Sequence, residues 1–168
     1  MLRFTYEMKK CIACQACQVA CKDKNHLETG TFFRRVATFA HNGTFVHFSG
    51  GCHHCEDAAC IKACQTQAMH RADDFTVAHD ASKCISCHAC VWSCPYGAVS
   101  ISKKTDLAQK CNSCADLRAS GSKPACVQAC LTHCLDFQEA AVNVKTVNEY
   151  PEFLAPKTIT KPKTMIIN

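Results

Sequence analysis

The sequence has no run of about 18 consecutive apolar residues, which is the length that a helix needs to cross the hydrocarbon core of a bilayer. It also has no apolar segment of the secretory type near its start, because the first ten residues carry several charges and lead directly into Cys11. Arg34 and Arg35 are adjacent, but no long apolar run follows them, so a twin-arginine signal is not expected. We therefore expect a chain without a membrane span, made in the reducing cytosol.

Bulky apolar side chains are also scarce. One Trp, three Tyr and nine Phe stand among 168 residues, and Ala and Cys supply much of the 48% hydrophobic fraction. A large aliphatic core is therefore not expected, and cross-links or metal sites are the two ways in which such chains are commonly stabilised. The G-x-S-x-G, P-loop and dinucleotide-binding motifs are missing, so we do not expect the chain to catalyse substrate chemistry by itself.

Cysteine, by contrast, is abundant: 17 of the 168 residues are Cys, a density well above that of ordinary globular proteins. Sixteen of them fall into four groups of four. The groups are Cys11, Cys14, Cys17 and Cys21; Cys52, Cys55, Cys60 and Cys64; Cys84, Cys87, Cys90 and Cys94; and Cys111, Cys114, Cys126 and Cys130. The seventeenth, Cys134, is expected to be a small buried thiol rather than a ligand.

The first and third groups share the spacing C-x2-C-x2-C-x3-C, and Pro95 follows the third. Bacterial ferredoxins bind iron–sulfur clusters with this spacing: three thiolates bind one cluster and the fourth binds the neighbouring one. The four groups therefore predict four [4Fe–4S] clusters. Structural zinc and a disulfide scaffold are the alternatives, but zinc needs only two C-x2-C pairs per ion, and disulfides suit neither an odd cysteine count nor a missing secretion signal.

Five segments resemble the four-cluster iron–sulfur subunit of the dimethyl sulfoxide reductase family of molybdopterin oxidoreductases. They are CIACQACQVACKD at 11–23, FFRRV at 32–36, CHHCEDAACIKAC at 52–64, CISCHACVWSCPYGA at 84–98 and KCNSCADLRASGSKPACVQAC at 110–130; the TKPKTMI segment at 160–166 is a weaker sixth.

The resemblance implies that the sixteen cysteines are iron ligands shared between groups. In this scheme Cys11, Cys14, Cys17 and Cys130 hold cluster 1; Cys111, Cys114, Cys126 and Cys21 hold cluster 2; Cys52, Cys55, Cys60 and Cys94 hold cluster 3; and Cys84, Cys87, Cys90 and Cys64 hold cluster 4.

Because one pair of groups is nested inside the other, the resemblance also implies an α+β fold of two interlocked bacterial-ferredoxin-like modules, one inserted in the other. The outer module would comprise residues 1–45 and 105–138 and the inserted module residues 46–104, with two clusters each. Residues 139–168, which contain three prolines, would form an extended C-terminal tail, either loose or laid over a partner as a docking arm. Local patterns predict a hairpin over 31–39 and 44–48, strands at 75–78 and 98–102, and helical turns at 57–65, 89–94 and 124–129.

A protein of this family is expected to be an electron-transfer subunit that passes single electrons along four clusters in a row. The resemblance implies a catalytic subunit with bis-molybdopterin guanine dinucleotide facing cluster 1, and a membrane anchor or quinol-oxidising subunit near cluster 4. The complex would lie at the periphery of the cytoplasmic membrane, exported with a partner that bears a twin-arginine signal. The alternatives are a cytoplasmic location, a soluble molybdoenzyme, formate dehydrogenase or hydrogenase complex, and a metal-structural protein without redox turnover.

The formal net charge of +5 does not indicate a nucleic-acid partner, because sixteen thiolates on four clusters would reverse its sign. The lysines near the cysteine groups are expected either to be solvated or to favour the reduced clusters. They are Lys9, Lys10, Lys22, Lys24, Lys83, Lys103, Lys104, Lys110 and Lys123. His53 and His54 are expected to be hydrogen-bond donors or packed rings, and Trp92 either a cover over a cluster or part of a contact surface.

Overall fold

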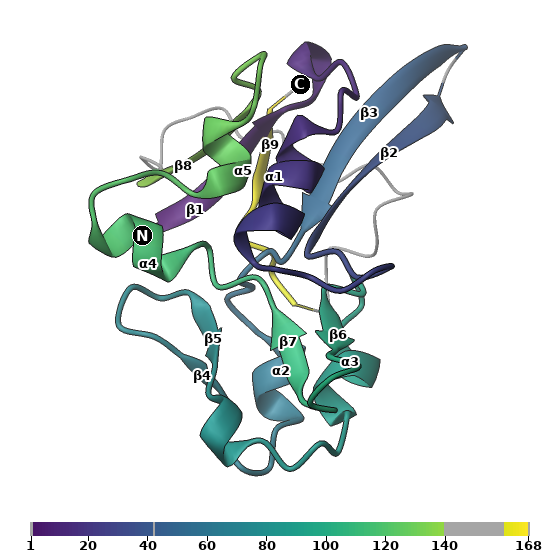
Figure 1. Ribbon diagram of the computed structural model, residues 1–168. Helices are drawn as coiled ribbons and strands as arrows, with labels where there is room; N and C mark the ends of the chain where they lie inside the picture. Colours follow the sequence, from purple (N-terminus) through teal and green to yellow (C-terminus); the bar gives the residue numbers. More distant parts are fainter. Residues whose placement is uncertain (1, 42, 140–159, 168) are drawn as a thin grey trace.

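The computed structural model describes residues 2–41, 43–139 and 160–167, and these form two lobes, one above the other in Figure 1. Within the described residues, no helix has the length and apolar character needed to span a membrane. The two lobes together are a small mixed α/β protein with short elements.

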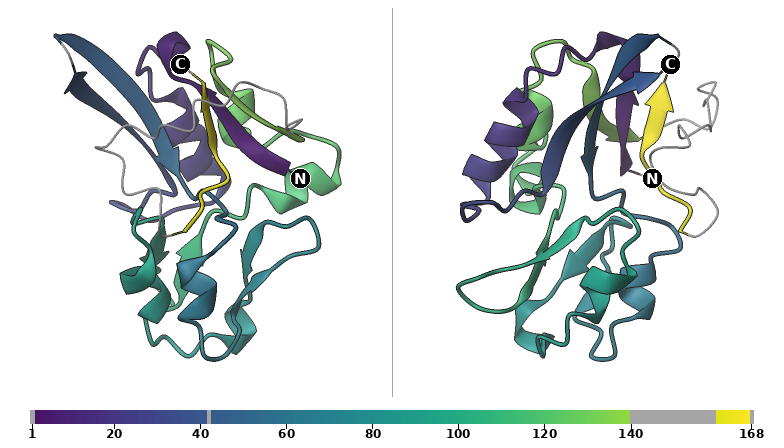
Figure 2. Two further views of the ribbon diagram at one scale, coloured as in Figure 1. Left: turned by 180° about the vertical axis from the view of Figure 1, so that it is seen from behind. Right: turned by 90° about the vertical axis from the view of Figure 1, so that its right-hand side faces the viewer.

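A three-stranded sheet lies in the upper lobe, with β1 (Leu2–Glu7) at its centre. β8 (Leu135–Glu139) pairs with β1 antiparallel, and β9 (Met165–Ile167) pairs with it parallel. Figure 2 shows β9 beside β1 from two further directions. Phe4 and Tyr6 of β1 are almost fully buried in the core of this lobe, and the Tyr6 hydroxyl donates a 2.8 Å hydrogen bond to the carbonyl of His47.

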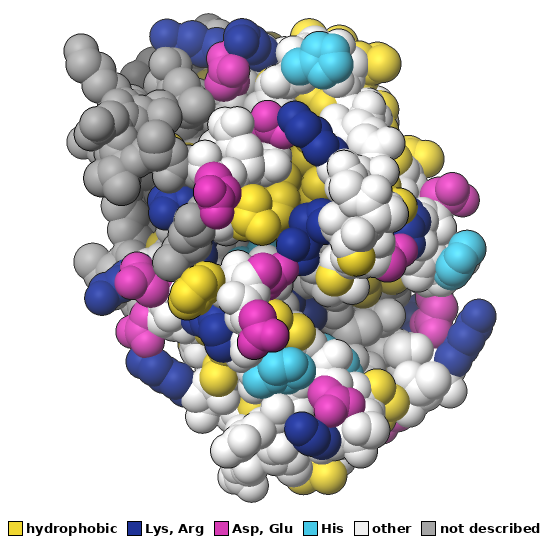
Figure 3. Space-filling view, turned by 90° about the vertical axis from the view of Figure 1, so that its left-hand side faces the viewer, with side chains coloured by type: hydrophobic (Ala, Val, Ile, Leu, Met, Phe, Trp, Pro, Cys, Tyr) yellow, Lys and Arg dark blue, Asp and Glu magenta, His cyan; other side chains and the backbone are white. Residues whose placement is uncertain are grey.

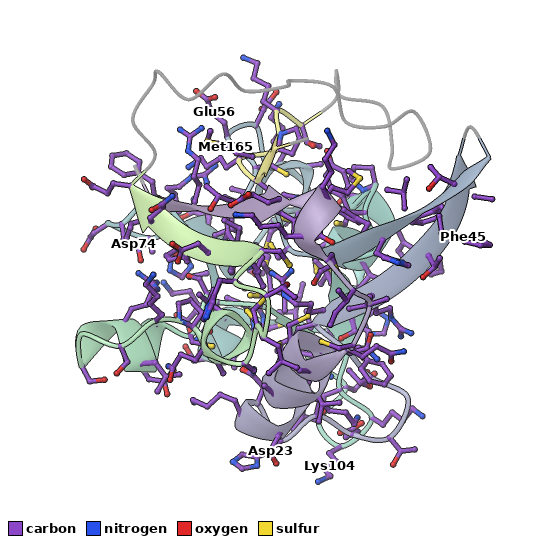
Figure 4. All side chains as sticks on the ribbon, turned by 90° about the horizontal axis from the view of Figure 1, so that it is seen from above. Asp23, Phe45, Glu56, Asp74, Lys104 and Met165 are labelled. Atoms are coloured by element: carbon purple, nitrogen blue, oxygen red, sulfur yellow. The ribbon has the colours of Figure 1, made fainter. Side chains whose placement is uncertain are left out.

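A long antiparallel hairpin and short helices complete the upper lobe. The hairpin consists of β2 (Arg34–His41) and β3 (Thr44–Gly51), and Phe45 lies near its projecting end (Figure 4). Gly43 has a φ of +75°, the left-handed conformation that this turn requires and that glycine adopts without steric cost. The helices are α1 (Ala16–Lys24), α4 (Ala115–Ala119) and α5 (Ala125–Gln128), with a 3-10 turn, η1, at Met8–Lys10. α1 packs against α5.

The lower lobe is built from two short hairpins and two single-turn helices. Its elements are α2 (Ala59–Lys62), β4 (Met69–Arg71), β5 (Val77–His79), the 3-10 turn η2 (Ala81–Lys83), α3 (Ala89–Ser93), β6 (Val99–Ile101) and β7 (Ala108–Lys110). β4 pairs with β5 and β6 pairs with β7, both antiparallel. Met69, Val77 and Val99 are buried, and half of the residues clustered with them are cysteines, so sulfur takes the place of missing aliphatic side chains.

Polar contacts join the two lobes on two sides. The carboxylate of Glu28 accepts hydrogen bonds from the backbone N–H groups of Lys103 and Lys104 and from the Ser102 hydroxyl. Asp74 forms a 2.6 Å ion pair with Arg118. Both contacts connect residues that are more than forty positions apart in the sequence, so they fix how the lobes sit against each other.

The segment from Thr160 joins the lobes a third time. The carbonyls of Thr160 and Lys161 accept hydrogen bonds from the N–H groups of Asp57 and Glu56, and the N–H of Lys163 donates to the carbonyl of His53. The next residues form β9 on the sheet of the upper lobe. The described end of the segment expected as a tail or docking arm therefore packs on its own chain, while residues 140–159 lie outside the described residues.

The hairpin expected over 31–39 and 44–48 is confirmed, as are the strands near 75–78 and 98–102 and the three helical turns, each within a few residues. The local patterns do not predict the strand β1 or its pairing with β8 and β9. They do not predict β4, β7 and α4 either.

Candidate iron–sulfur sites

The cysteine loops repeat an unusual backbone conformation. Ala13 and Gln15 have φ values of 56° and 63° between the cysteines of the first group, and Ser86 and His88 have φ values of 56° and 59° at the same offsets in the third. Non-glycine residues seldom adopt this left-handed conformation, which costs free energy unless the surroundings enforce it. Turns of this kind point successive backbone N–H groups into one concave space and so favour an anion there. Both loops are therefore shaped to wrap a negatively charged group.

We call the four ligand groups that the resemblance implies sets 1 to 4. Set 1 is Cys11, Cys14, Cys17 and Cys130; set 2 is Cys21, Cys111, Cys114 and Cys126; set 3 is Cys52, Cys55, Cys60 and Cys94; and set 4 is Cys64, Cys84, Cys87 and Cys90. In Figure 4 sulfur atoms are seen in the interior, between the elements.

Sets 1 and 4 each line a cavity. All four cysteines of set 1 line one cavity, together with Cys134, Ile12 and Ser49. All four cysteines of set 4 line another, together with Met69 and Ile85. In each case three thiols come from a single C-x2-C-x2-C loop and the fourth comes from a distant segment of the polypeptide.

In sets 2 and 3, neighbouring thiols affect one another's ionisation. Burial raises the pKa of Cys21 to about 12, and the nearby thiols of Cys126 and Cys114, with Cys17 of set 1, contribute to this shift. Burial likewise raises the pKa of Cys60 to about 12, with contributions from Cys52, Cys94 and Cys55.

The four sets follow one another through the protein. Burial raises the pKa of Cys17, and the thiol of Cys126 contributes, so set 1 adjoins set 2. Burial also raises the pKa of Cys111, and here the thiol of Cys52 is the largest charge effect, so set 2 adjoins set 3. α2, which carries Cys60, packs on α3, which carries Cys90 and belongs to set 4. The sets therefore form a series from the upper lobe to the lower one.

Two of the sulfurs accept hydrogen bonds within a repeated local structure. The N–H of Met69 donates to Sγ of Cys64 at 3.3 Å, and the Thr66 hydroxyl lies 3.7 Å from the same sulfur. Burial opposes ionisation there, but these bonds outweigh it and lower the pKa of Cys64. Cys130 has the same arrangement with Thr132 and the N–H of Leu135, and its pKa is lowered as well. Hydrogen bonds to a ligand sulfur are one of the means by which proteins set a cluster's potential.

The residues present fit [4Fe–4S] clusters. All 17 cysteines carry free thiols. Most of those with a shifted pKa are raised by burial, to about 11 for Cys55, so that strong binding to iron is needed to displace the protons. In the described part of the chain, no three His, Cys, Asp or Glu side chains converge to hold one metal ion. A cubane instead places each of four sulfurs on a different iron.

The outer ends of the series are exposed and apolar. Cys14 and Cys87, one in set 1 and one in set 4, are the two exposed cysteines. Ile12 and Leu131 are 60% and 70% exposed beside set 1, and Ile85 and Trp92 are 61% and 85% exposed beside set 4. The expectation that Trp92 covers a cluster is therefore wrong: its ring lies in solvent, as the alternative of a contact surface requires.

Four of the nine lysines expected near the clusters form ion pairs at the surface. Lys24 pairs with Asp116, Lys123 with Asp136, and Lys10 and Lys83 with neighbouring carboxylates. On the face shown in Figure 3, positive and negative side chains are interspersed. Lys110 is different: it is 6% exposed and donates to the carbonyls of Val77 and Cys111.

Arg34 is a buried cation that sequence analysis missed, and Lys163 is another. Arg34 is 4% exposed, and its charge acts on sulfurs of sets 1 and 2. The adjacent Arg35 is exposed. Strand alternation predicts that two neighbouring arginines point to opposite faces, but it does not say which one faces inward.

His53 and His54 are packed rings, as one of the two expectations had it. His53 makes an edge contact with the ring of Tyr96 at 4.4 Å, and His54 stacks near Phe4. Burial lowers the pKa of His53 to about 3, so this ring is neutral. Nδ1 of His54 accepts a hydrogen bond from the N–H of Val77. Cys134 is 5% exposed, which agrees with the prediction of a small buried thiol.

Comparison with known proteins finds iron–sulfur proteins. Residues 44–140 match the family described as "4Fe-4S dicluster domain", and residues 8–25 match a "4Fe-4S binding domain". Over 146 residues the sequence is 37% identical to one polypeptide of the anaerobic dimethyl sulfoxide reductase of Escherichia coli, an overlap of 80% of this protein and 71% of that one. It is 41% identical over 141 residues to the thiosulfate reductase electron transfer subunit of Salmonella typhi, covering 79% and 72%. It is 38% identical over 156 residues to one of the subunits of the sulfite dehydrogenase of Allochromatium vinosum, covering 77% and 65%.

Proposed function

Because this protein belongs to the iron–sulfur electron-transfer subunits of the dimethyl sulfoxide reductase family, we propose that it carries electrons between a molybdopterin catalytic subunit and a membrane quinol-linked subunit. Its cofactors are [4Fe–4S] clusters, and its cysteine count fits four of them. It is an electron-transfer subunit of an oxidoreductase complex rather than the catalytic subunit.

In this proposal each of the four sets holds one cluster, with the sixteen cysteines as the iron ligands. The observation that carries it is the composition of the two cavities. Each is lined by three thiols of one C-x2-C-x2-C loop and by a fourth thiol that lies far away in the sequence, Cys130 in set 1 and Cys64 in set 4. Sharing of ligands between distant groups is the ferredoxin pattern.

The same sharing supports a fold of two interlocked ferredoxin-like modules, one inserted in the other. Sets 1 and 2 draw their cysteines from 11–21 and 111–130, which lie in the upper lobe. Sets 3 and 4 draw theirs from 52–94, which lie in the lower lobe (Figure 1). Residues 1–45 with 105–138, and residues 46–104, are the proposed modules.

When bound, each cluster supplies a centre that takes up and releases one electron at a time. The protein's own residues do the rest. The cysteine loops fix the positions of the sulfurs, and burial of cysteines such as Cys21 and Cys126 keeps water from the middle of the series. The N–H groups of Met69 and Leu135 donate to ligand sulfurs and so favour the more negative, reduced state.

The exposed ends suit electron entry and exit. We place the catalytic subunit, with bis-molybdopterin guanine dinucleotide, at set 1, where Cys14 reaches the surface between Ile12 and Leu131. The membrane anchor or quinol-oxidising subunit then belongs at set 4, beside Ile85 and Trp92. The complex would sit at the periphery of the cytoplasmic membrane, co-exported with a partner bearing a twin-arginine signal.

Anaerobic purification followed by iron and sulfide analysis tests this proposal. About sixteen irons per polypeptide are expected, with four centres detectable by low-temperature electron paramagnetic resonance on reduction. Cys52→Ser should remove or convert one centre and stop quinol-driven turnover, while substrate reduction by the catalytic subunit from an artificial donor continues. Cys134→Ser is the matched control and should leave all four centres. Stoichiometric zinc in place of iron, or full quinol-driven turnover in Cys52→Ser, would contradict the proposal.

A further inference from the structure

Arg34 is the least exposed of the lysines and arginines that the structure describes, at 4%. Its guanidinium lies over the ring of Phe4, with 4.8 Å from Cζ to the ring centroid. Nη1 donates to the carbonyl oxygen of Ser49 at 2.8 Å and to its hydroxyl oxygen at 3.1 Å. Opposite Arg34 on β3 stands Gly51, where an added Cβ would lie 3.1 Å from the carbonyl oxygen of Phe33 and 3.4 Å from Nη2 of Arg34.

No carboxylate forms an ion pair with Arg34 within residues 2–41, 43–139 and 160–167. The ionisable groups near it are cysteine sulfurs instead. Burial opposes the charge, but the sulfurs of Cys126, Cys111, Cys17 and Cys21 outweigh it and raise the pKa of Arg34. These sulfurs belong to set 1 (Cys17) and set 2. A buried cation is destabilising unless a negative charge compensates it, so sets 1 and 2 supply that compensation when they hold clusters.

Ser49 connects Arg34 to one particular sulfur. The Sγ of Cys17 lies 3.3 Å from the Ser49 hydroxyl oxygen. A guanidinium has donors and no acceptor, so this oxygen must accept from Arg34. The hydroxyl proton of Ser49 is thereby left to donate to Cys17. Arg34 thus acts on set 1 both through its charge and through a hydroxyl whose direction it fixes.

We propose that Arg34 is a redox-tuning residue that raises the reduction potentials of the clusters in sets 1 and 2 together. Each one-electron reduction adds a negative charge beside the buried guanidinium; no covalent bond forms or breaks, and the electron comes from the preceding carrier in the complex. The attraction is stronger than at the surface, because little water lies between the charges. Ser49 adds a second effect that is confined to set 1. This inference rests on the cluster assignment proposed above.

The test is a redox titration of the four centres, followed by electron paramagnetic resonance, in the complete complex purified anaerobically. Two neutral variants, Arg34→Gln and Arg34→Met, remove the charge; methionine keeps an unbranched side chain in the packed site. Arg34→Lys keeps the charge. Arg35→Gln is the matched control, because it removes the same charge from the next residue of the same strand, where the side chain is exposed. Ser49→Ala removes only the hydroxyl.

At the potential where a wild-type centre is half reduced, the neutral variants should lower the ratio of reduced to oxidised form at least about tenfold, or about 59 mV, at two of the four centres. In Arg34→Lys this ratio should stay within about threefold of the wild-type value. In Arg35→Gln it should stay within about twofold at all four centres. Ser49→Ala should lower the ratio of reduced to oxidised form about fivefold at one of the two affected centres.

Iron content distinguishes an error in the cluster assignment from an error in the role of Arg34. Fewer than four centres in the wild-type complex would overturn the cluster assignment itself. Four intact centres that all stay within twofold of wild type in the neutral variants would overturn the role of Arg34 alone. If both neutral variants lose iron while Arg34→Lys keeps it, the clusters of sets 1 and 2 depend on the charge, which supports the proposal. If Arg34→Lys loses iron equally, the shape of the side chain is what matters, and the proposal is wrong.

Discussion

The Sγ atom of Cys134 lies 3.5 Å from the Sγ atom of Cys130, and both residues line the cavity of set 1. Only one of them can occupy the fourth position of that set. Cys130 follows the N–H and hydroxyl pattern that it shares with Cys64, and its pKa is lowered, whereas burial raises the pKa of Cys134 to about 12. The ligand is therefore proposed to be Cys130.

Replacement of each of these two cysteines by alanine tests which of them is the ligand. Cys134→Ala should keep about sixteen irons per polypeptide, whereas Cys130→Ala should lose one cluster, or about four irons. Loss of the small buried sulfur of Cys134 should lower the free energy of unfolding by about 1 kcal/mol. Iron analysis and thermal unfolding under anaerobic conditions measure both effects. A cluster lost from Cys134→Ala and retained in Cys130→Ala would reverse the assignment.

The ion pair between Asp74 and Arg118 should hold the two lobes together. Asp74→Asn is expected to lower the free energy of unfolding by about 1 kcal/mol, and thereby the thermal midpoint by about 2–4 °C. Asp57→Asn, which removes a more exposed ion pair with Lys62 inside one lobe, is the control and should change the midpoint by less. An equal effect of both substitutions would show that Asp74 contributes nothing as a link between lobes.

The pH dependence of this loss has a definite sign. Burial tends to raise the pKa of Asp74, but hydrogen bonds from Thr76 and the ion pair with Arg118 outweigh it and lower the pKa below 3.8. A carboxylate with a lowered pKa stabilises the folded state above the unfolded pKa, and this contribution disappears as the pH falls through the folded pKa. The difference in thermal midpoint between wild type and Asp74→Asn should therefore be constant from pH 8 to pH 6. A difference that shrinks within that range would contradict it.

Removal of residues 160–168 should loosen the junction between the lobes. The deletion abolishes three backbone hydrogen bonds to residues 53–57 and the pairing of β9 with β1. We therefore expect the free energy of unfolding to fall by more than about 3 kcal/mol. Hydrogen exchange should increase in β1 and at 53–57. Lys161→Ala, which alters an exposed side chain in the same segment, should leave both regions protected. Unchanged exchange in β1 after the deletion would show that β9 adds nothing to the sheet.

Trp92 should be an energetic centre of a subunit contact. Its ring is 85% exposed beside set 4, and large aromatic rings at interfaces often account for about 2 kcal/mol or more of binding. Trp92→Ala is expected to weaken association with the membrane-side partner at least about tenfold and to leave all four centres in place. Phe75→Ala, also at an exposed aromatic ring of the lower lobe, is the comparison and should weaken association less. Both co-purification and titrated binding measure this, and an unchanged affinity would exclude Trp92 from the contact.

The cysteine sets can be anticipated in part because the position of each thiol within its loop is fixed locally. Residues 11, 14 and 17 lie on one tight loop, and the next cysteine stands one helical turn further on, in α1. The hairpin of β2 and β3 is equally local, since it needs only Phe-rich and Thr-rich strands around a turn. What joins Cys130 to the loop of Cys11 is not local, and the sequence supplies that pairing only through resemblance to a family.

Arg34, β1 and β9 show where local reasoning fails. Leu2, Phe4 and Tyr6 alternate as in a strand, but the pairing of β1 with a segment near residue 165 depends on the whole fold. Which of Arg34 and Arg35 turns inward depends on which face of the hairpin packs against α1, which no pattern within the strand reveals. Trp92 is misplaced for a related reason: an aromatic residue among cysteines suggests a cover, yet in α3 it stands two residues after the buried Cys90 and therefore on another face of the helix.

The sheet that contains β1 has a consequence for biosynthesis. The ribosome makes β1 more than 120 residues before its partner β8, and β9 later still. Cys11, Cys14 and Cys17 likewise wait for Cys130. During translation the N-terminal strand thus presents an open edge of the kind that promotes aggregation, and the first cysteine loop has only three of its four thiols. Iron delivery to that site can be completed only after most of the polypeptide has emerged, which favours loading after translation and a chaperone that shields the N-terminal strand until then.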